Sequence, residues 1–262
     1  MSNIGFIGVG YMGYGIAKNI LKHSHKLFVV ANKNRKPIEK IVSEGAKEIE
    51  SIEEFSNKNL DCLFMCVTNT PIAKSVSEKL SKILNAKTII IDITTHNKTG
   101  SIETEKIFKS NNINYIECPV MGGPVQAEEG VLGGIVGASE SNFKLAEPYL
   151  KIFCKDYFYF GPVGMGAKSK LLNNFLSLGN AALVNHLAKT AIELDLDLKK
   201  VFDVAKLGSG NSTALVRVFD NLLKGDFTGF KFTATNSVKD LTYIQDLLKD
   251  FPEAEKVAKI NK

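Results

Sequence analysis

A glycine-rich turn near the start of the chain constrains the fold more than any other feature. Gly8, Gly10 and Gly13 directly follow the apolar run "NIGFI" and open a helical pattern. In a strand–turn–helix unit, this G-x-G-x-x-G spacing is typical of a dinucleotide-binding loop, in which the second glycine lets a pyrophosphate approach the backbone and the third lets helix and strand pack closely. With Tyr11 and Met12, these glycines are predicted to bind a pyrophosphate at the helix start. A glycine turn without a ligand is the alternative.

Short β-branched runs alternate with helical patterns over the first 160 residues. The runs read as strands that are apolar on both faces, as in a parallel sheet covered by helices. They span 3–7, 26–31, 61–67, 87–92 and 114–119, with helical patterns near 11–22, 36–44, 71–84 and 98–110. Pro71 suits a first helical turn. Because βαβ crossovers are right-handed, the succession predicts an α/β fold with a doubly wound, mostly parallel sheet of the Rossmann type.

The pattern changes between Gly161 and Gly164, and we place a domain boundary there, giving domains 1–163 and 164–262. From Ala167 to about Leu196, apolar residues occupy nearly every face of one long helical pattern. These residues are Leu171, Leu172, Phe175, Leu176, Leu178, Leu183, Val184, Leu187 and Ile192. A helix that is apolar all round must be buried, here against further helices near 199–206, 213–223 and 236–249. The second domain is therefore expected to be all-helical.

Composition and charge exclude several classes of protein. The hydrophobic fraction of 44% is that of a globular protein, and no run reaches the roughly 18 consecutive apolar residues of a membrane span. The net charge of +5 is not gathered into a basic and aromatic cluster, so no nucleic-acid partner is expected. Four cysteines without a CxxC pair predict neither a metal site nor disulfides. No secretory signal is visible, so we expect a cytoplasmic protein.

The segment after the second strand bears on the choice of dinucleotide. An NAD site offers Asp or Glu about 20 residues past the glycines, to accept hydrogen bonds from the ribose hydroxyls. This chain instead reads "VVANKNRKP", with Asn32, Lys33, Asn34 and Arg35. Such a cationic segment attracts a 2′-phosphate and favours NADP, with NAD possible as a second cofactor. A basic loop that meets only water is the alternative.

Six blocks of the sequence resemble the β-hydroxyacid dehydrogenases in their order and spacing. They are "GFIGVGYMGYGIAKNI", "VVANKNRKP", "IIDITTHNKTG", "ECPVMGGPVQAEEGVLGGIVGAS", "GPVGMGAKSKLLNNFL" and "NSVKDL", and they cover nearly the whole chain. The family includes 3-hydroxyisobutyrate dehydrogenase and the tartronate, succinic and glyoxylate semialdehyde reductases. The resemblance implies a nicotinamide-binding domain joined by a long helix to an all-helical domain, with the active site in the cleft between them.

The resemblance also implies roles for individual residues. Lys170 resembles the catalytic lysine and Asn174 its polar partner, while Gly122 and Gly123 resemble the turn whose amides hold the substrate carboxylate. Thr95 and Lys239 are implied to lie near the nicotinamide ribose, and Thr95 also to face the substrate. Val67, Thr68 and Asn69 are implied to lie along the adenosine ribose and pyrophosphate. Phe232 is implied to lie near the substrate or cofactor.

Helix geometry separates the two lysines of "GAKSKLLNN". Lys170 and Asn174 lie about 40° apart on one helical face, whereas Lys168 points about 200° away from Lys170. Reduction of a carbonyl needs a proton for the developing alkoxide, and a partly desolvated lysine is able to give it. We therefore predict that Lys170 is the acid/base of an NADP-preferring oxidoreductase that interconverts a small β-hydroxyacid and its semialdehyde. A merely solvated helix lysine is the alternative.

Two features depart from the family. Met121 stands where relatives commonly have a serine before the Gly-Gly pair, and a methionine cannot donate the hydroxyl hydrogen bond to a bound acid, so the substrate stays open. Relatives usually continue with further helices where this sequence stops at "KVAKINK". Missing helices would expose apolar surface that a partner subunit could cover, which favours a homo-oligomer.

Three further interpretations follow from the same residues. An imine reductase on this scaffold is one alternative, although those relatives usually replace the lysine that Lys170 represents. A dinucleotide-binding module without turnover is another, suggested by Met121 and the short C-terminus. His96 follows "DITT" at the carboxyl end of a strand, where open α/β sheets bind ligands, and is a candidate for the cleft.

Overall fold

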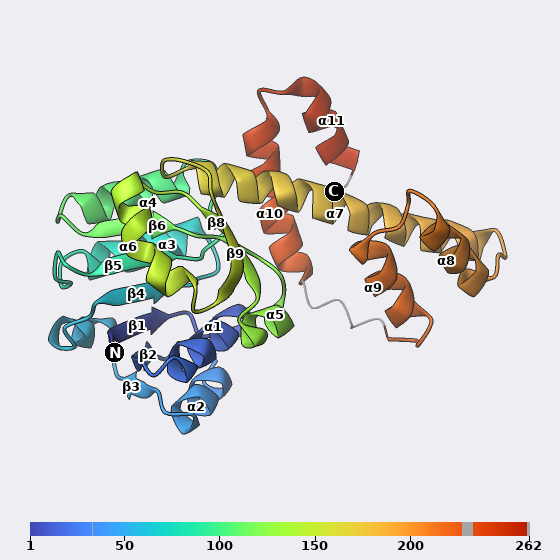
Figure 1. Cartoon of the computed structure of the whole chain (residues 1–262). Coiled ribbons are helices and arrows are strands. Elements are labelled where there is room, and N and C mark those ends of the chain that lie inside the picture. Colours follow the sequence, from blue (N-terminus) through green and yellow to red (C-terminus); the bar gives the residue numbers. More distant parts are fainter. Residues whose placement is uncertain (33, 227–232, 261–262) are drawn as a thin grey trace. The chain divides into compact units, whose positions relative to one another are not determined.

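The computed structural model describes residues 1–32, 34–226 and 233–260 (Figure 1). The chain divides into two compact units, Met1–Lys170 and Leu171–Lys262. Two residues of the predicted site, Lys33 and Phe232, lie outside the described residues. Among the described helices, none has the length and hydropathy needed to cross a bilayer.

A six-stranded parallel sheet forms the centre of the first unit, in the order β3-β2-β1-β4-β5-β6 (Figure 1). The strands are β1 (Asn3–Ile7), β2 (Lys26–Val30), β3 (Lys47–Ile49), β4 (Cys62–Met65), β5 (Ile89–Asp92) and β6 (Asn114–Glu117). The strand order reverses between β1 and β4, and such a reversal marks the edge at which open α/β sheets bind ligands. The predicted Rossmann fold is confirmed, while β3 was not predicted.

Helices cover both faces of this sheet because its strands are apolar on both faces. They are α1 (Tyr11–Lys22), α2 (Lys36–Ser43), the 3-10 helix η1 (Ile52–Asn57), α3 (Thr70–Leu80), α4 (Gly100–Lys109) and α6 (Glu140–Leu150). Neighbouring residues of β1 point to opposite faces: Phe6 joins a core with α1, α2 and α6, whereas Ile7 joins a core with η1, α3 and α4. Pro71 lies in the first turn of α3, as predicted.

A second, three-stranded sheet follows β6 and was not predicted. It contains β7 (Val120–Met121), β8 (Leu132–Val136) and β9 (Cys154–Tyr159), with α5 (Pro124–Glu129) between β7 and β8. β7 and β8 are antiparallel, and β8 and β9 are parallel. The strand expected over 114–119 ends at Glu117, which forms a bridge with Gly137 next to β8. A two-residue strand and the glycine-rich "LGGIV" of β8 give too weak a periodic signal to be read from sequence.

The described part of the second unit is helical. α7 (Met165–Glu193) begins in the first unit and is followed by α8 (Leu198–Leu207), α9 (Thr213–Leu222), α10 (Ala234–Leu248) and α11 (Pro252–Ile260). One core packs Leu171 against Ile244 of α10, and another packs Val184 against Phe202 of α8 and Phe219 of α9. The sequence assigned no element to α11.

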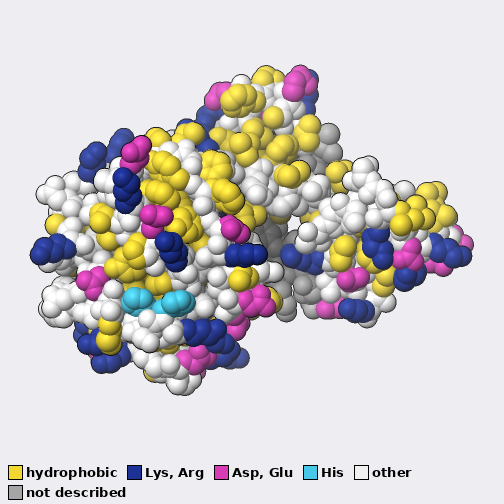
Figure 2. Space-filling view, in the orientation of Figure 1, with side chains coloured by type: hydrophobic (Ala, Val, Ile, Leu, Met, Phe, Trp, Pro, Cys, Tyr) yellow, Lys and Arg dark blue, Asp and Glu magenta, His cyan; other side chains and the backbone are white. Residues whose placement is uncertain are grey.

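The expectation that α7 is buried on every face is wrong for the described chain. Leu172, Leu176 and Leu183 are 52%, 64% and 63% exposed, while Leu171 and Val184 are buried. Figure 2 shows hydrophobic side chains at the surface of the helical segments. The reason is that the described helices cover only one stripe of α7, so an apolar pattern on all faces does not by itself supply a partner for each face.

Candidate active site

The three glycines of the first turn have different surroundings. Gly8 directly follows β1 with a φ of 95°, and a Cβ there would lie 2.0 Å from the carbonyl oxygen of Cys66. A Cβ on Gly13 would lie 2.2 Å from the carbonyl oxygen of Gly8, so the close packing expected of the third glycine is confirmed. A Cβ on Gly10 would meet nothing within 4 Å. Packing of the protein therefore requires Gly8 and Gly13, whereas Gly10 borders open space.

The start of α1 fits an anionic group. Gly10 is the N-cap residue and has no side chain to cap the helix, whose first turn contains no acidic residue. The first amides of a helix have no partner within it, and the positive end of the helix dipole favours negative charge. Tyr11 is exposed and Met12 is half-buried beside this turn. These are the properties that the pyrophosphate of a dinucleotide requires.

Arg35, expected to face a 2′-phosphate, has carboxylate partners of its own. Its Nη2 donates to both carboxylate oxygens of Glu48 at 3.0 and 3.1 Å, and its Nε lies 3.6 Å from Glu39 Oε1. Asn32 and Asn34 are exposed. A phosphate bound at this guanidinium would compete with Glu48, so the positive charge of this segment is partly offset.

Hydrogen bonds join the loops that follow β4 and β5. The amide of Val67 donates to Thr94 Oγ1 at 3.2 Å, and the amide of Asn97 donates to Thr70 Oγ1 at 3.1 Å. Thr95, between Thr94 and Asn97, is half-buried. Because Cys66 also contacts the glycine turn, the predicted cofactor residues of both loops share one edge of the sheet with that turn.

Two further residues were assigned to the cofactor in the loop after β4. Asn69 is the N-cap of α3, and its Oδ1 accepts a hydrogen bond from the amide of Ile72 at 3.0 Å. Thr68 is exposed. The Asn69 side chain therefore has a structural role in the helix start, beside any contact with a cofactor.

His96 is not a cleft residue, and this expectation was wrong. It is only 1% exposed, with Nε2 2.8 Å from Asp92 Oδ2 and Nδ1 3.3 Å from Thr70 Oγ1. Asp92 Oδ2 also accepts a hydrogen bond from the Tyr115 hydroxyl at 2.9 Å. Burial raises the pKa of Tyr115 well above its ordinary value, so this hydroxyl keeps its proton. Partners inside the protein thus occupy both ring nitrogens of the histidine.

Lys170 lies against the strand that leads into the Gly-Gly turn. Its Nζ donates to the carbonyl oxygen of Val120 at 2.8 Å and lies 3.4 Å from Met121 Sδ. Gly122 follows directly, with a φ of 115° that favours glycine. The amide of Gly123 donates to the Oε1 of Gln126 at 2.9 Å, so a substrate carboxylate would have to displace that side chain to use this donor.

The other lysine of the same helix start has a different environment. Lys168 is exposed, as its position on the helix predicted, whereas Lys170 is half-buried. The structure therefore places one lysine in solvent and the other against β7.

Asn174 and Lys239 lie in the second unit, where a carboxylate connects them. Asn174 is buried, and its Nδ2 donates to Asp240 Oδ2 at 2.7 Å. The other oxygen of Asp240 lies 3.1 Å from Lys239 Nζ, which in turn lies 5.7 Å from the ring centre of Tyr243. Asp240 was missed as a functional candidate, although it stands inside the "NSVKDL" block.

Two buried carboxylates of the first unit were also missed. Asp92 and Glu117 are both 0% exposed, and each is the last residue of its strand, directly after a buried isoleucine. Acidic side chains are almost never fully buried unless they are paired. An acidic residue that closes an apolar strand is therefore the signal that could have identified them.

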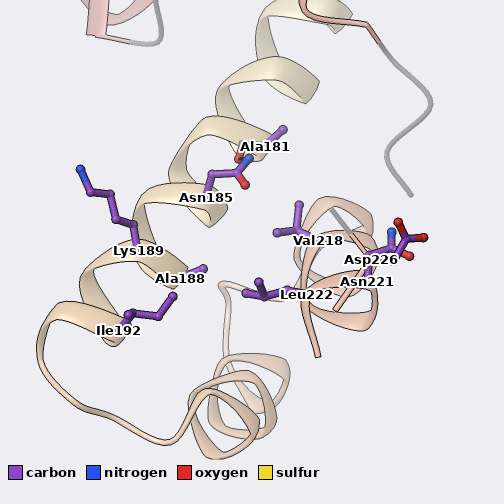
Figure 3. Close-up of a pocket in the computed structure, with 9 residues that line it drawn as sticks. All are labelled: Ala181, Asn185, Ala188, Lys189, Ile192, Val218, Asn221, Leu222 and Asp226. Carbon is purple, nitrogen blue, oxygen red and sulfur yellow. Dashed lines mark hydrogen bonds between the residues drawn. The ribbon is translucent and has the colours of Figure 1, made fainter. Parts of the chain in front are cut away.

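A surface pocket of the second unit contains none of the predicted site residues (Figure 3). It lies between α7 and α9 and is lined by Ala181, Asn185, Ala188, Lys189, Ile192, Val218, Asn221, Leu222 and Asp226. The amides of Asn185 and Asn221 donate to carbonyl oxygens of their own helices, at 2.8 Å each. The chemistry indicated by the sequence therefore lies elsewhere.

Comparison with known protein families matches nearly the whole chain. Residues 3–161 match the NAD-binding domain of 6-phosphogluconate dehydrogenase, and residues 164–258 match the NAD-binding domain of NADP-dependent 3-hydroxyisobutyrate dehydrogenase. These matches define a nicotinamide dinucleotide-binding oxidoreductase. The chain belongs to the family of NAD(P)-dependent, 3-hydroxyisobutyrate dehydrogenase-like hydroxyacid dehydrogenases.

Individual relatives agree with this family. The chain is 28% identical over 230 residues to 2-(hydroxymethyl)glutarate dehydrogenase of Eubacterium barkeri, covering 86% of this chain and 76% of that protein. It is 28% identical over 255 residues to the mitochondrial 3-hydroxyisobutyrate dehydrogenase of Bos taurus, covering 93% and 74%. The solved 3-hydroxyisobutyrate dehydrogenase of Salmonella typhimurium shares the fold, with a TM-score of 0.87 at 22% identity over 100% of this chain and 93% of that one.

Proposed function

We propose that this protein is an NADP-preferring oxidoreductase that interconverts a small β-hydroxyacid and its semialdehyde, with Lys170 as the acid/base. The observation that carries the proposal is the position of the Lys170 ammonium, which lies 2.8 Å from the Val120 carbonyl oxygen. Val120 and Met121 directly precede the Gly122–Gly123 turn. The names of the relatives support a hydroxyacid as the substrate class.

The residues divide the chemistry among them. The nicotinamide cofactor, when bound, supplies the hydride that adds to the carbonyl carbon. Lys170 donates a proton to the carbonyl oxygen during reduction and, when neutral, accepts it back from the hydroxyl during oxidation. While it is cationic, it also stabilises the negative charge that develops on that oxygen. Gly122 and Gly123 hold the carboxylate through their amides once the carboxylate has displaced Gln126 from the Gly123 amide, and Met121 offers an apolar surface where relatives have a hydroxyl.

The cofactor site of the proposal lies at the edge formed by β1, β4 and β5. Gly8, Gly10 and Gly13, with Tyr11 and Met12, hold the pyrophosphate at the start of α1. The ribose-side residues of the proposal are Val67, Thr68, Asn69, Thr95 and Lys239, and Asn174 is proposed as the polar partner of Lys170. Support comes from the open space above Gly10 and from the bonded loops after β4 and β5.

The preference for NADP rests on the segment Asn32–Arg35. Lys33→Asp is expected to weaken NADPH binding more than NADH binding, because it places a negative charge where the 2′-phosphate is proposed to lie. Lys87→Asp makes the same charge change just before β5, at the amino ends of the parallel strands, and should alter neither affinity. Titration of the nicotinamide fluorescence gives both dissociation constants. An unchanged ratio of the two in Lys33→Asp contradicts the NADP preference.

The proposal also divides the chain by task. Residues 1–163 bind the cofactor, and residues 164–262 supply substrate contacts and the contact surface of a homo-oligomer. The two matched family models meet between residues 161 and 164, which supports this boundary. Support for the oligomer comes from the exposed leucines of α7.

One assay tests the function against its alternatives. The purified protein is mixed with NADPH or NADH and a panel of short semialdehydes and cyclic imines, and the loss of nicotinamide absorbance is followed. We expect reduction of at least one semialdehyde. Reduction of imines alone would establish an imine reductase instead. NADPH binding without turnover on the whole panel would establish a binding module.

A further inference from the structure

A buried carboxylate from β6 holds the start of α7. Glu117 Oε1 accepts hydrogen bonds from the amides of Gly164 at 2.6 Å and Gly166 at 2.8 Å. These amides stand at the beginning of α7, where the helix itself offers no acceptor. Glu117 is 0% exposed, so water does not compete for these bonds. A side chain 47 residues earlier in the sequence therefore serves as the cap of this helix.

The surroundings of Glu117 are built to bring the carboxylate close to the helix. A Cβ on Gly137 would lie 2.1 Å from Glu117 Oε1, and a Cβ on Gly166 would lie 3.0 Å from the same atom. Glu117 and Gly137 also exchange both backbone hydrogen bonds at 3.0 Å. The other carboxylate oxygen, Oε2, and the hydroxyl of Ser101 are buried without an aligned hydrogen bond among the described residues. One carboxylate oxygen of Glu117 thus accepts hydrogen bonds from the start of α7, and the other is buried against protein atoms.

The segment that follows Glu117 contacts α7 a second time. Val120 and Met121 bind the Lys170 side chain, with Nζ 2.8 Å from the Val120 carbonyl oxygen. Gly166 and Lys170 are one helical turn apart, which is about 6 Å along the axis. One short segment, 117–121, therefore fixes both the first turn of α7 and the ammonium of Lys170, and it leads directly into the Gly122–Gly123 turn.

We propose that Glu117 is a positioning residue for Lys170. By holding the amides of Gly164 and Gly166, it sets the rotation and height of the first turns of α7, so that the ammonium meets a carbonyl group bound at the Gly122–Gly123 turn. This inference rests on the proposed function of Lys170 as acid/base. A displacement of a catalytic group by about 1 Å is enough to lower a rate by about 10²-fold, so loss of the cap is expected to act on turnover.

Three substitutions test the positioning role. Glu117→Ala removes the acceptor for both amides, and kcat per NADPH-binding site should fall about 10²-fold, with the dissociation constant of NADPH unchanged. Glu117→Gln keeps an acceptor oxygen at the helix and adds an amide that is able to donate to Ser101, so it should restore turnover to near the wild-type value. Gly166→Ala crowds Oε1 without changing the carboxylate and should lower kcat in the same way. Glu105→Ala on α4 is the matched control and should leave kcat unchanged.

A second readout does not depend on turnover. Acetylation by an amine-specific reagent, followed by mass spectrometry, gives the rate at Lys170 relative to the exposed Lys168. We expect this ratio to rise in Glu117→Ala and to stay at the wild-type value in Glu117→Gln. An unchanged ratio in Glu117→Ala overturns the inference.

The two proposals fail in different ways. If the wild-type protein reduces nothing on the panel, the proposed function falls, while the acetylation ratio still decides whether Glu117 positions Lys170. If the wild type is active and Glu117→Ala keeps its kcat, or Glu117→Gln loses as much as Glu117→Ala, the positioning role is overturned and the proposed function stands.

Discussion

The two units of the chain use their apolar residues differently. In the first unit, Phe6, Leu63 and Ile90 are 0% exposed, because helices of the same unit cover both faces of the sheet. In the second unit, Leu176 and Leu183 of α7 are 64% and 63% exposed. In the first unit, helices of the same unit therefore bury both apolar faces of the strands. In the second unit, the described helices leave part of the apolar surface of α7 exposed, and this surface is available to a further partner.

The largest effect is expected from a substitution that disturbs the close packing of the first unit at the glycine turn. Gly8→Ala combines a positive φ with a Cβ 2.0 Å from the Cys66 carbonyl oxygen. We expect the free energy of unfolding, measured in urea, to fall by about 2–5 kcal/mol. Gly10→Ala adds the same methyl group where nothing lies within 4 Å, so stability should hold while NADPH affinity falls at least tenfold. Equal destabilisation by both substitutions contradicts the separation of packing from binding.

Neighbouring residues of α7 sharpen the comparison in the second unit. Val184 is 7% exposed and Leu183 is 63% exposed. Val184→Glu buries a charge in the core with Phe202 and Phe219 and should destabilise this unit by about 3 kcal/mol or more. Leu183→Glu should leave the helix content unchanged and shift the assembly toward a monomer, as measured by light scattering. A wild-type protein that is already monomeric contradicts the homo-oligomer.

The smallest expected effect concerns the buried carboxylate of β6. Burial raises the pKa of Glu117, so its charged form is less favourable in the folded protein than in the unfolded chain. Its contribution to stability is complete below the unfolded pKa of about 4.3 and is lost as the pH rises through the higher folded pKa. Gln is neutral at every pH. The melting temperature of Glu117→Gln should therefore gain a few degrees on the wild type between about pH 4.5 and pH 8.

The neighbours of Glu117 do not alter this sign. Burial raises the pKa of Tyr115, and a hydrogen bond with Cys154 together with burial raises the pKa of Cys118, so both remain neutral in this pH range. Thermal unfolding of the two proteins over the pH range is the measurement. A difference in melting temperature that does not change with pH would show that the folded-state pKa of Glu117 is not raised.

The sequence predicted local elements better than contacts between them. Five of the six strands of the parallel sheet were predicted because each is a compact β-branched run between helical patterns. The second sheet was not predicted, because β7 has only two residues and β8 contains a glycine pair. The glycine turn was recognised from spacing, yet only the three-dimensional structure distinguishes Gly10, which borders open space, from Gly8, which does not.

The candidate site shows the same limit. The helical spacing of Lys168 and Lys170 was enough to predict which of them is exposed. The contact of Lys170 with Val120 joins residues 50 apart, and the capping of α7 by Glu117 joins residues 47 apart, so no local pattern encodes either. His96 was misread because its partner Thr70, 26 residues earlier, becomes its neighbour only when the loops after β4 and β5 meet.

The most direct test of the central claim compares the two lysines of α7. Kinetics with a reduced semialdehyde and NADPH are measured for Lys170→Ala and Lys168→Ala, together with the dissociation constant of NADPH. Removal of Lys170 should lower kcat by about 10²–10⁴-fold with cofactor affinity nearly intact, since its role is in the transition state, and removal of Lys168 should change little. Equal effects of the two substitutions, or full turnover in Lys170→Ala, would contradict the assignment of Lys170 as the acid/base.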